Sequence, residues 1–224
     1  MTREELNNKL IEAVKAGRME DVKHCLAAGA DIDAMDNYGS VPITEASCHD
    51  HEHILEFLLK QGADPNIADG GDWTAMTYAC YYRRNLKIIR MLLEAGADIN
   101  LKNIYGDTLL SNICRDARNK KKIVAILLSF GADPNIISED SETALMRLAR
   151  RGHTGLMKAL IRHGADVTIK NHAGNTALDI LRMNCRNKYD KWIFDSVTRP
   201  RKDVLEKEDG DLPSLSMSTP DYNI

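Results

Sequence analysis

Long apolar runs are missing from this 224-residue sequence. A membrane-spanning helix requires about 18 consecutive apolar residues, and no apolar stretch here approaches that length. Its first ten residues, MTREELNNKL, include two acids and no apolar core, so we expect no secretory signal. The five cysteines are odd in number and form no C-x-x-C pair, which argues against a disulfide framework and against a cysteine-based zinc site. Free thiols favour a reducing compartment, and we expect a cytoplasmic, intracellular protein.

Catalytic motifs are also missing: the sequence has no Gly-rich phosphate loop, H-E-x-x-H helix or G-x-S-x-G turn. The densest group of titratable side chains is His49-Asp50-His51-Glu52-His53, whose imidazoles would suit zinc. His49 and His53 share a face only if this segment is helical, and we expect a turn at Asp50-His51 instead. We therefore predict no enzymatic activity, no cofactor and no metal site, with zinc binding by the histidines as the less favoured alternative.

Charge is unevenly distributed, although the net charge is only −3. Residues 1–75 hold 6 Lys and Arg against 15 Asp and Glu, residues 76–202 hold 23 against 12, and residues 203–224 hold 1 against 6. This order of acidic, basic and acidic blocks bears on the attraction of partners more than on the fold. The last segment has almost no periodic apolar face, so we predict a disordered acidic tail over residues 199–224.

Five similar segments recur along the chain: AAGADID, KQGADPN, EAGADIN, SFGADPN and RHGADVT. Their glycines lie 33, 34, 35 and 33 residues apart, a period typical of stacked supersecondary units. Between them, a Thr or Val that can start a helix precedes a first apolar pattern, and a second apolar pattern ends at the glycine. Each unit is therefore predicted to be helix, turn, helix and loop.

This pattern resembles the ankyrin repeat family in its period, its recurring threonine and its turn glycines. The resemblance implies an all-α fold, an ankyrin-repeat solenoid of helix-turn-helix units joined by hairpin-like loops. We expect the repeat domain to span residues 1–198. Its predicted parts are an N-terminal unit at 4–36, full repeats at 37–69, 70–103, 104–138 and 139–171, and a C-terminal cap at 172–198.

The sequence departs from the family pattern at several places. One extra residue near Arg83 and Arg84, and two within 116–122, fall between predicted helices, so we expect protruding loops there. Asp72 and Ser141 stand where a turn glycine is expected, so we expect these two hairpins to bend differently.

Aromatic residues are scarce, yet five of the twelve fall on the loop tips and first-helix ends. In an ankyrin stack these positions line one concave side, and arginines flank the rings here. Trp, Tyr and Arg dominate the energetics of binding surfaces, so we expect these rings and arginines to bind a partner. Tyr78, earlier on the same predicted helix, is better explained by packing. The candidate partner-binding residues are Tyr38, Trp73, Tyr81, Tyr82, Arg83, Tyr105, Arg115, Arg150 and Arg151.

We therefore predict a non-catalytic protein–protein interaction module, acting as an adaptor, inhibitor or scaffold. The expected partner is a protein with an acidic, aromatic-accepting surface; we expect a monomer that contacts no membrane. The alternative is that the basic half, residues 83–122 and 147–162, binds nucleic acid or another polyanion, for example through Lys120, Lys121 and Lys122. The pI of 6.2 lies below the basic range of dedicated nucleic-acid domains, which disfavours this alternative.

Overall fold

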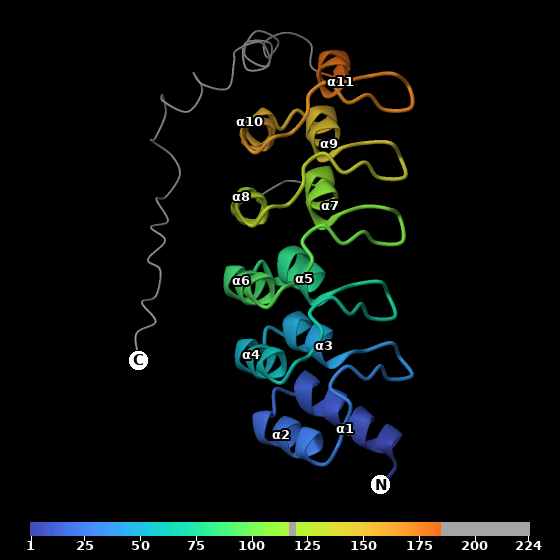
Figure 1. Ribbon diagram of the computed structural model, residues 1–224, viewed down its shortest axis with the longest axis vertical. Coiled ribbons are helices and arrows are strands. Elements are labelled where there is room, and N and C mark those ends of the chain that lie inside the picture. Colours follow the sequence, from blue (N-terminus) through green and yellow to red (C-terminus); the bar gives the residue numbers. More distant parts are fainter. Residues whose placement is uncertain (117–119, 185–224) are drawn as a thin grey trace, which may run out of the picture. The chain divides into compact units, whose positions relative to one another are not determined.

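The computed structural model describes residues 1–116 and 120–184, which form a stack of helix pairs without any strand. The first helices of the pairs lie in one column, the second helices lie in a parallel column, and long loops project from the other side of the first column (Figure 1). The first helices are α1 (Arg3–Lys15), α3 (Pro42–Cys48), α5 (Ala75–Tyr78), α7 (Leu109–Arg115), α9 (Ala144–Arg151) and α11 (Ala177–Asn184). The second helices are α2 (Met19–Ala27), α4 (Glu52–Lys60), α6 (Leu86–Glu94), α8 (Lys121–Ser129) and α10 (Thr154–Arg162). The predicted all-α solenoid is confirmed.

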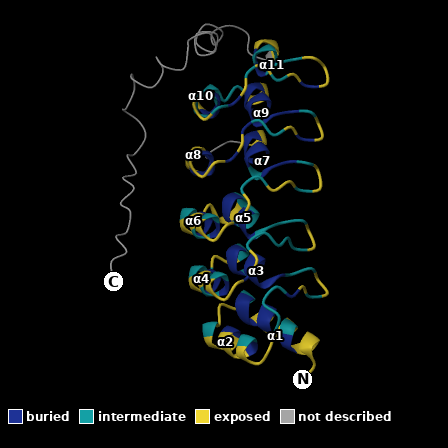
Figure 2. Ribbon diagram, viewed as in Figure 1, coloured by how far each residue is buried: buried dark blue, intermediate teal, exposed yellow. Residues whose placement is uncertain are grey.

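The apolar core lies between the two columns. Figure 2 shows that the first helices are largely buried, whereas the loop tips and the outer sides of the second helices are exposed. Ile43, Leu55, Ile89 and Leu127 are among the side chains that are fully buried there. Burying one such side chain stabilises the fold by about 1.5–3 kcal/mol, so the stacking of repeats supplies most of the stability.

One polar side chain organises each of four loops. Its oxygen accepts hydrogen bonds from the backbone N–H groups two and four residues later, as at Asp36, Asp69, Asn103 and Asn171. This arrangement fixes the backbone of the tip residues. It thereby places Tyr38, Trp73 and Tyr105 at defined positions in front of the first helices.

The extra residue of the third unit lengthens a helix. Helix α5 continues directly into a π-helix over Ala79–Arg83, and Arg84 then ends it in the left-handed conformation, with φ of 51°. A π turn accommodates one residue more than an α turn, so the chain absorbs the insertion without the protruding loop that we expected at Arg83 and Arg84. The second predicted loop falls partly on residues 117–119, which lie outside the described residues.

The two hairpins that lack a turn glycine keep the same bend as the others. Asp72 and Ser141 have φ values of 63° and 59°, close to the 66° of Gly106. The expectation that these turns bend differently is therefore wrong. Each non-glycine residue there costs about 1 kcal/mol relative to glycine, because its Cβ approaches the backbone in the left-handed region.

The predicted acidic tail at 199–224, and residues 185–198 of the predicted cap, lie outside the part of the chain that the structure describes. Within the described part, no helix has the length and apolar character needed to cross a membrane.

Candidate protein-binding surface

Four aromatic rings meet where the loop of the third unit, residues 70–103, joins its first helix. The centroid of the Trp73 ring lies 5.4 Å from that of Tyr78, 5.7 Å from Tyr81 and 5.3 Å from Tyr82. The rings of Tyr78 and Tyr82, four residues apart on one helical face, stack at 5.9 Å. We call Trp73, Tyr78, Tyr81 and Tyr82 the aromatic cluster. Its ring separations are those of favourable aromatic pairs, each of which contributes about 0.5–1.5 kcal/mol beyond burial.

Hydrogen bonds and packing fix the positions of the rings in the cluster. The Tyr78 hydroxyl donates to Asp69 Oδ2 at 2.6 Å, and Asp69 Oδ1 accepts from the backbone N–H of Trp73. Burial and this bond raise the pKa of Tyr78, so its hydroxyl stays protonated. Tyr81 is half-buried, with the Lys120 ammonium 4.0 Å from its ring centroid. Tyr82 remains 67% exposed and presents the cluster to solvent.

The other predicted residues of this region lie outside the ring contacts. Tyr38 and Tyr105 stand at the tips of the neighbouring loops and are 92% and 65% exposed. Arg83 follows Tyr82 and donates from Nε to the carbonyl of Cys48 at 2.5 Å. The structure thus brings together Trp73, Tyr81 and Tyr82, with Arg83 at their edge.

The remaining three predicted arginines line one open pocket of about 440 Å³. The pocket lies along the first helices α7 and α9 and the loops before α9 and α11. Arg115, Arg150 and Arg151 are all exposed there. Acidic side chains pair with these arginines: Arg115 pairs with Asp107 at 2.9 Å, and Arg150 pairs with Glu142. The full lining is Arg115, Asp140, Glu142, Arg147, Arg150, Arg151 and His172.

Arg147 is the residue at this pocket that sequence reasoning missed. Its side chain is only 2% exposed, and its Nη2 donates to Asp107 Oδ1 at 2.5 Å, to Ser138 Oγ at 2.8 Å and to Asp140 Oδ2 at 2.9 Å. Its Nε and Nη1 have no hydrogen-bond partner among the described residues. The sequence signal for it is an arginine inside the otherwise apolar run ALMRLA. An arginine at such a position is buried, and a buried charge needs a nearby counter-charge.

Asp140 responds to this arginine. Burial acts to raise the pKa of its carboxyl group, but hydrogen bonds from Ser138 and Arg147 outweigh that effect. The resulting pKa of Asp140 lies below the ordinary value for an aspartate. The carboxylate is therefore charged at neutral pH and helps to hold Arg147 in place.

The basic half carries less free positive charge than its sequence indicates. Lys120 is only 4% exposed, and burial lowers the pKa of its ammonium group. Arg115, Arg147 and Arg150 pair with acids, whereas Lys121 and Lys122 are exposed. Within the described residues, the lysine segment therefore presents two of its three predicted basic side chains to solvent.

The histidine-rich segment forms the expected turn. Helix α3 ends at Cys48, Asp50 has a φ of 64°, and α4 begins at Glu52. The His51 ring nitrogen Nε2 lies 3.2 Å from the carbonyl oxygen of Lys15, and His53 is exposed on α4. Residues 49 and 53 therefore do not share a continuous helical face.

A family model for ankyrin repeats (3 copies) matches residues 10–103 and 110–194. The chain belongs to the ankyrin repeat family. Ankyrin repeats are protein–protein interaction modules, so the coarse functional prediction is confirmed with the family. The described helix pairs with their hairpin-like loops agree with this assignment (Figure 1).

The matching relatives are proteins of very different length. The E3 ubiquitin-protein ligase KEG of Arabidopsis thaliana is 28% identical over 158 residues, which cover 66% of this chain and 9% of that protein. Ankyrin repeat and SOCS box protein 16 of Homo sapiens is 27% identical, covering 76% of this chain and 39% of the relative. The ankyrin repeat protein YahD of Escherichia coli is 27% identical and is covered over 86% of its length. The chain thus spans less than half of the first two proteins.

Two solved structures share the fold. An ankyrin repeat domain from Acinetobacter baumannii has a TM-score of 0.72 and 27% identity, covering 84% of this chain and 96% of that chain. A chain in the complex of the Bd0816 predatory endopeptidase from Bdellovibrio bacteriovorus with immunity protein Bd3460 has a TM-score of 0.67 and 28% identity. That match covers 84% of this chain and 97% of the other.

Proposed function

We propose that this protein is a non-catalytic adaptor or inhibitor that binds a partner protein through its loop tips and first helices, the concave side of an ankyrin stack. The aromatic cluster carries this proposal. Tyr82 is 67% exposed although the rings of Trp73 and Tyr78 both contact it. An exposed ring that is already held in place loses little conformational freedom on binding, which is the property of a binding anchor.

The pocket of arginines supports an acidic partner. Four arginines line it, and three of them pair with Asp107, Asp140 and Glu142, so these seven side chains together keep a surplus of one positive charge. Arg151 is exposed at its edge, where it could form a charge-assisted hydrogen bond with a partner's carboxylate. Such pairs mainly increase the association rate and set the orientation of the partner, whereas the rings provide the buried apolar contact.

The likeness to a chain of the endopeptidase–immunity protein complex supports the inhibitor form of this proposal. The scaffold and adaptor forms are supported by the family alone. In each form we propose that the repeat domain spans residues 1–198, acts inside the cell and binds as a monomer.

Affinity capture from the native organism tests the proposal. The bait proteins are the wild type, the double variant Trp73→Ala/Tyr82→Ala and the matched control Phe130→Ala. Phe130 is an exposed aromatic residue at the end of α8 in the second column, away from the proposed surface. A protein retained by the wild type and the control, but lost from the double variant, supports the surface. Equal retention by all three baits contradicts it.

A further inference from the structure

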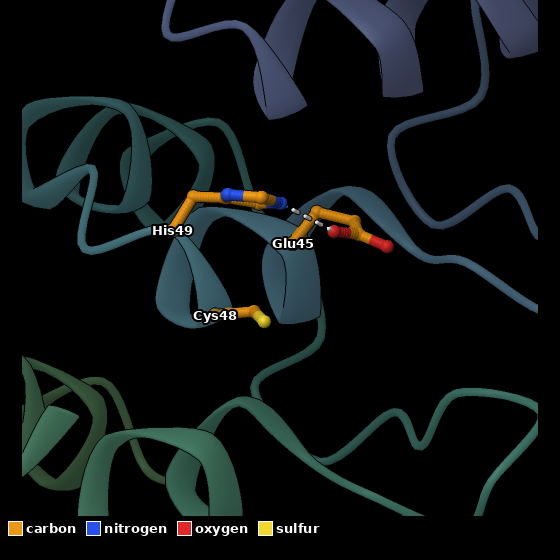
Figure 3. A group of neighbouring side chains, drawn as sticks. All are labelled: Glu45, Cys48 and His49. Carbon is orange, nitrogen blue, oxygen red and sulfur yellow. Dashed lines mark ion pairs between the residues drawn. The ribbon is translucent and has the colours of Figure 1, made fainter. Parts of the chain in front are cut away.

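The C-terminal end of α3 and the residue that follows it carry three potential metal ligands. Glu45, Cys48 and His49 are spaced i, i+3 and i+4, so their side chains lie on neighbouring positions of one helical face. One ligand atom from each lies within 4.8 Å of the others, and Figure 3 shows the three side chains extending in a similar direction. His49 Nε2 lies 3.3 Å from Glu45 Oε2. Two ligands at tetrahedral positions around zinc are about 3.4 Å apart, as follows from metal–ligand bonds of about 2.1 Å.

We propose that Glu45, Cys48 and His49 bind Zn²⁺ as three protein ligands, leaving a fourth tetrahedral position for water. Carboxylate, thiolate and imidazole are all accepted zinc ligands, and three protein ligands with one open position is a known zinc geometry. The three histidines alone do not indicate this site, and we expected no metal site from the sequence. The E-x-x-C-H spacing is the sequence signal for this site.

The surrounding charges permit a divalent cation here. Lys15 Nζ lies 3.9 Å from Glu45 Oε1, but it also lies 3.5 Å from the carboxylate of Asp36, whose side chain is 7% exposed. Asp36 therefore matches the lysine charge. The Glu45 carboxylate and the Cys48 thiolate then remain to balance the two positive charges of the metal ion.

Binding must remove the proton of Cys48. A coordinated thiol is deprotonated by the metal, so the site releases a proton when the ion binds. Affinity should consequently increase with pH near neutrality, because protons compete with the metal for sulfur.

The other described cysteines are poorly placed to compete. Cys25, Cys80 and Cys114 are buried free thiols, whereas Cys48 is partly accessible. Cys185 lies outside the described residues, so it needs its own control. The site also contacts the unit that carries the aromatic cluster, because the Cys48 carbonyl accepts a hydrogen bond from Arg83.

A cobalt titration of the untagged full-length chain tests the site, with the chain kept reduced and first treated with chelator. We expect one Co²⁺ per chain, a thiolate-to-cobalt charge-transfer absorption and loss of that absorption when Zn²⁺ is added. Cys48→Ser should abolish the absorption. Glu45→Gln and His49→Ala should each weaken Co²⁺ binding about tenfold or more, since each removes one ligand.

Two variants serve as controls, and circular dichroism checks that every variant is folded. His53→Ala and Cys185→Ser should bind Co²⁺ as the wild type does. Zn²⁺ should also raise the unfolding midpoint of the wild type but not that of Cys48→Ser, because a ligand of the native state stabilises it. Absence of saturable binding, absorption that persists in Cys48→Ser, or absorption lost in Cys185→Ser would each overturn the proposal.

Discussion

Arg147 offers the sharpest test of how the arginine pocket is held together. The perturbation is Arg147→Met, which keeps an unbranched apolar side chain but removes the guanidinium group. Asp107, whose side chain is 1% exposed, would lose its 2.5 Å contact with Arg147 and keep only its pairing with Arg115. A buried carboxylate would then be incompletely compensated.

The size of the effect follows from these contacts. Removing one partner of a buried ion pair costs about 3–5 kcal/mol. Arg115 is 54% exposed and retains its bond to Asp107, so we expect the lower end, about 3 kcal/mol of unfolding free energy. The double variant Arg147→Met/Asp107→Asn no longer buries a charge. It should recover about 2 kcal/mol of that loss, as a coupling energy between the two contacting positions.

Urea unfolding followed by far-ultraviolet circular dichroism measures these values for the wild type, both single variants and the double variant. Arg151→Met is the matched control, because Arg151 is an exposed arginine on the same helix, α9. Its unfolding free energy should change by less than about 0.5 kcal/mol. Strictly additive effects of Arg147→Met and Asp107→Asn, or no loss in Arg147→Met, would refute the reasoning.

Three further predictions concern the turns, the pH dependence and the basic half. Ser141→Gly should raise the unfolding free energy by about 1 kcal/mol. Asp72→Gly should raise it less, because the Asp72 carboxylate accepts a backbone hydrogen bond from the next loop; denaturant titration measures both values. The lowered pKa of Asp140 gives a stabilisation that is complete above about pH 4 and is lost as pH falls through the folded pKa. The difference in unfolding free energy between the wild type and Asp140→Asn should therefore shrink in acid. A difference that stays constant with pH would contradict the lowered pKa. Gel retardation at low salt should show no binding of duplex DNA or RNA; retardation lost in Lys121→Gln/Lys122→Gln would favour the polyanion alternative.

The repeat architecture was predictable because each unit carries its own local signals. Each unit has a Thr or Val before its first helix and, in the units with a second helix, a glycine after it, and these signals act over short distances. Their recurrence near every 33 residues can therefore be read without tertiary information. Thr108, for example, accepts a hydrogen bond from the N–H of Ser111 at the start of α7. The exceptions at Asp72 and Ser141 were misjudged because their backbone N–H groups make the same turn hydrogen bonds, to the carbonyls of Asp69 and Ser138, as Gly106 makes in its own turn.

The candidate surface was only partly predictable. Trp73, Tyr81 and Tyr82 could be grouped because they fall on adjacent rows of the repeat. The π-helix could not be foreseen, because an inserted residue can equally form a loop, and only the packing of α5 and α6 decides between them. The pairing of Arg147 with Asp107 joins residues 40 positions apart, and the sequence alone does not indicate that these two side chains are in contact.

The affinity of a purified partner for this protein tests the central claim most directly. Isothermal titration calorimetry would compare the wild type, Trp73→Ala/Tyr82→Ala and the Phe130→Ala control. Loss of central aromatic anchors should weaken binding by about 2 kcal/mol or more, which is about a 30-fold rise in Kd, while the control should bind as the wild type does. Equal Kd values for the wild type and the double variant, with both proteins folded, would contradict binding through the aromatic cluster.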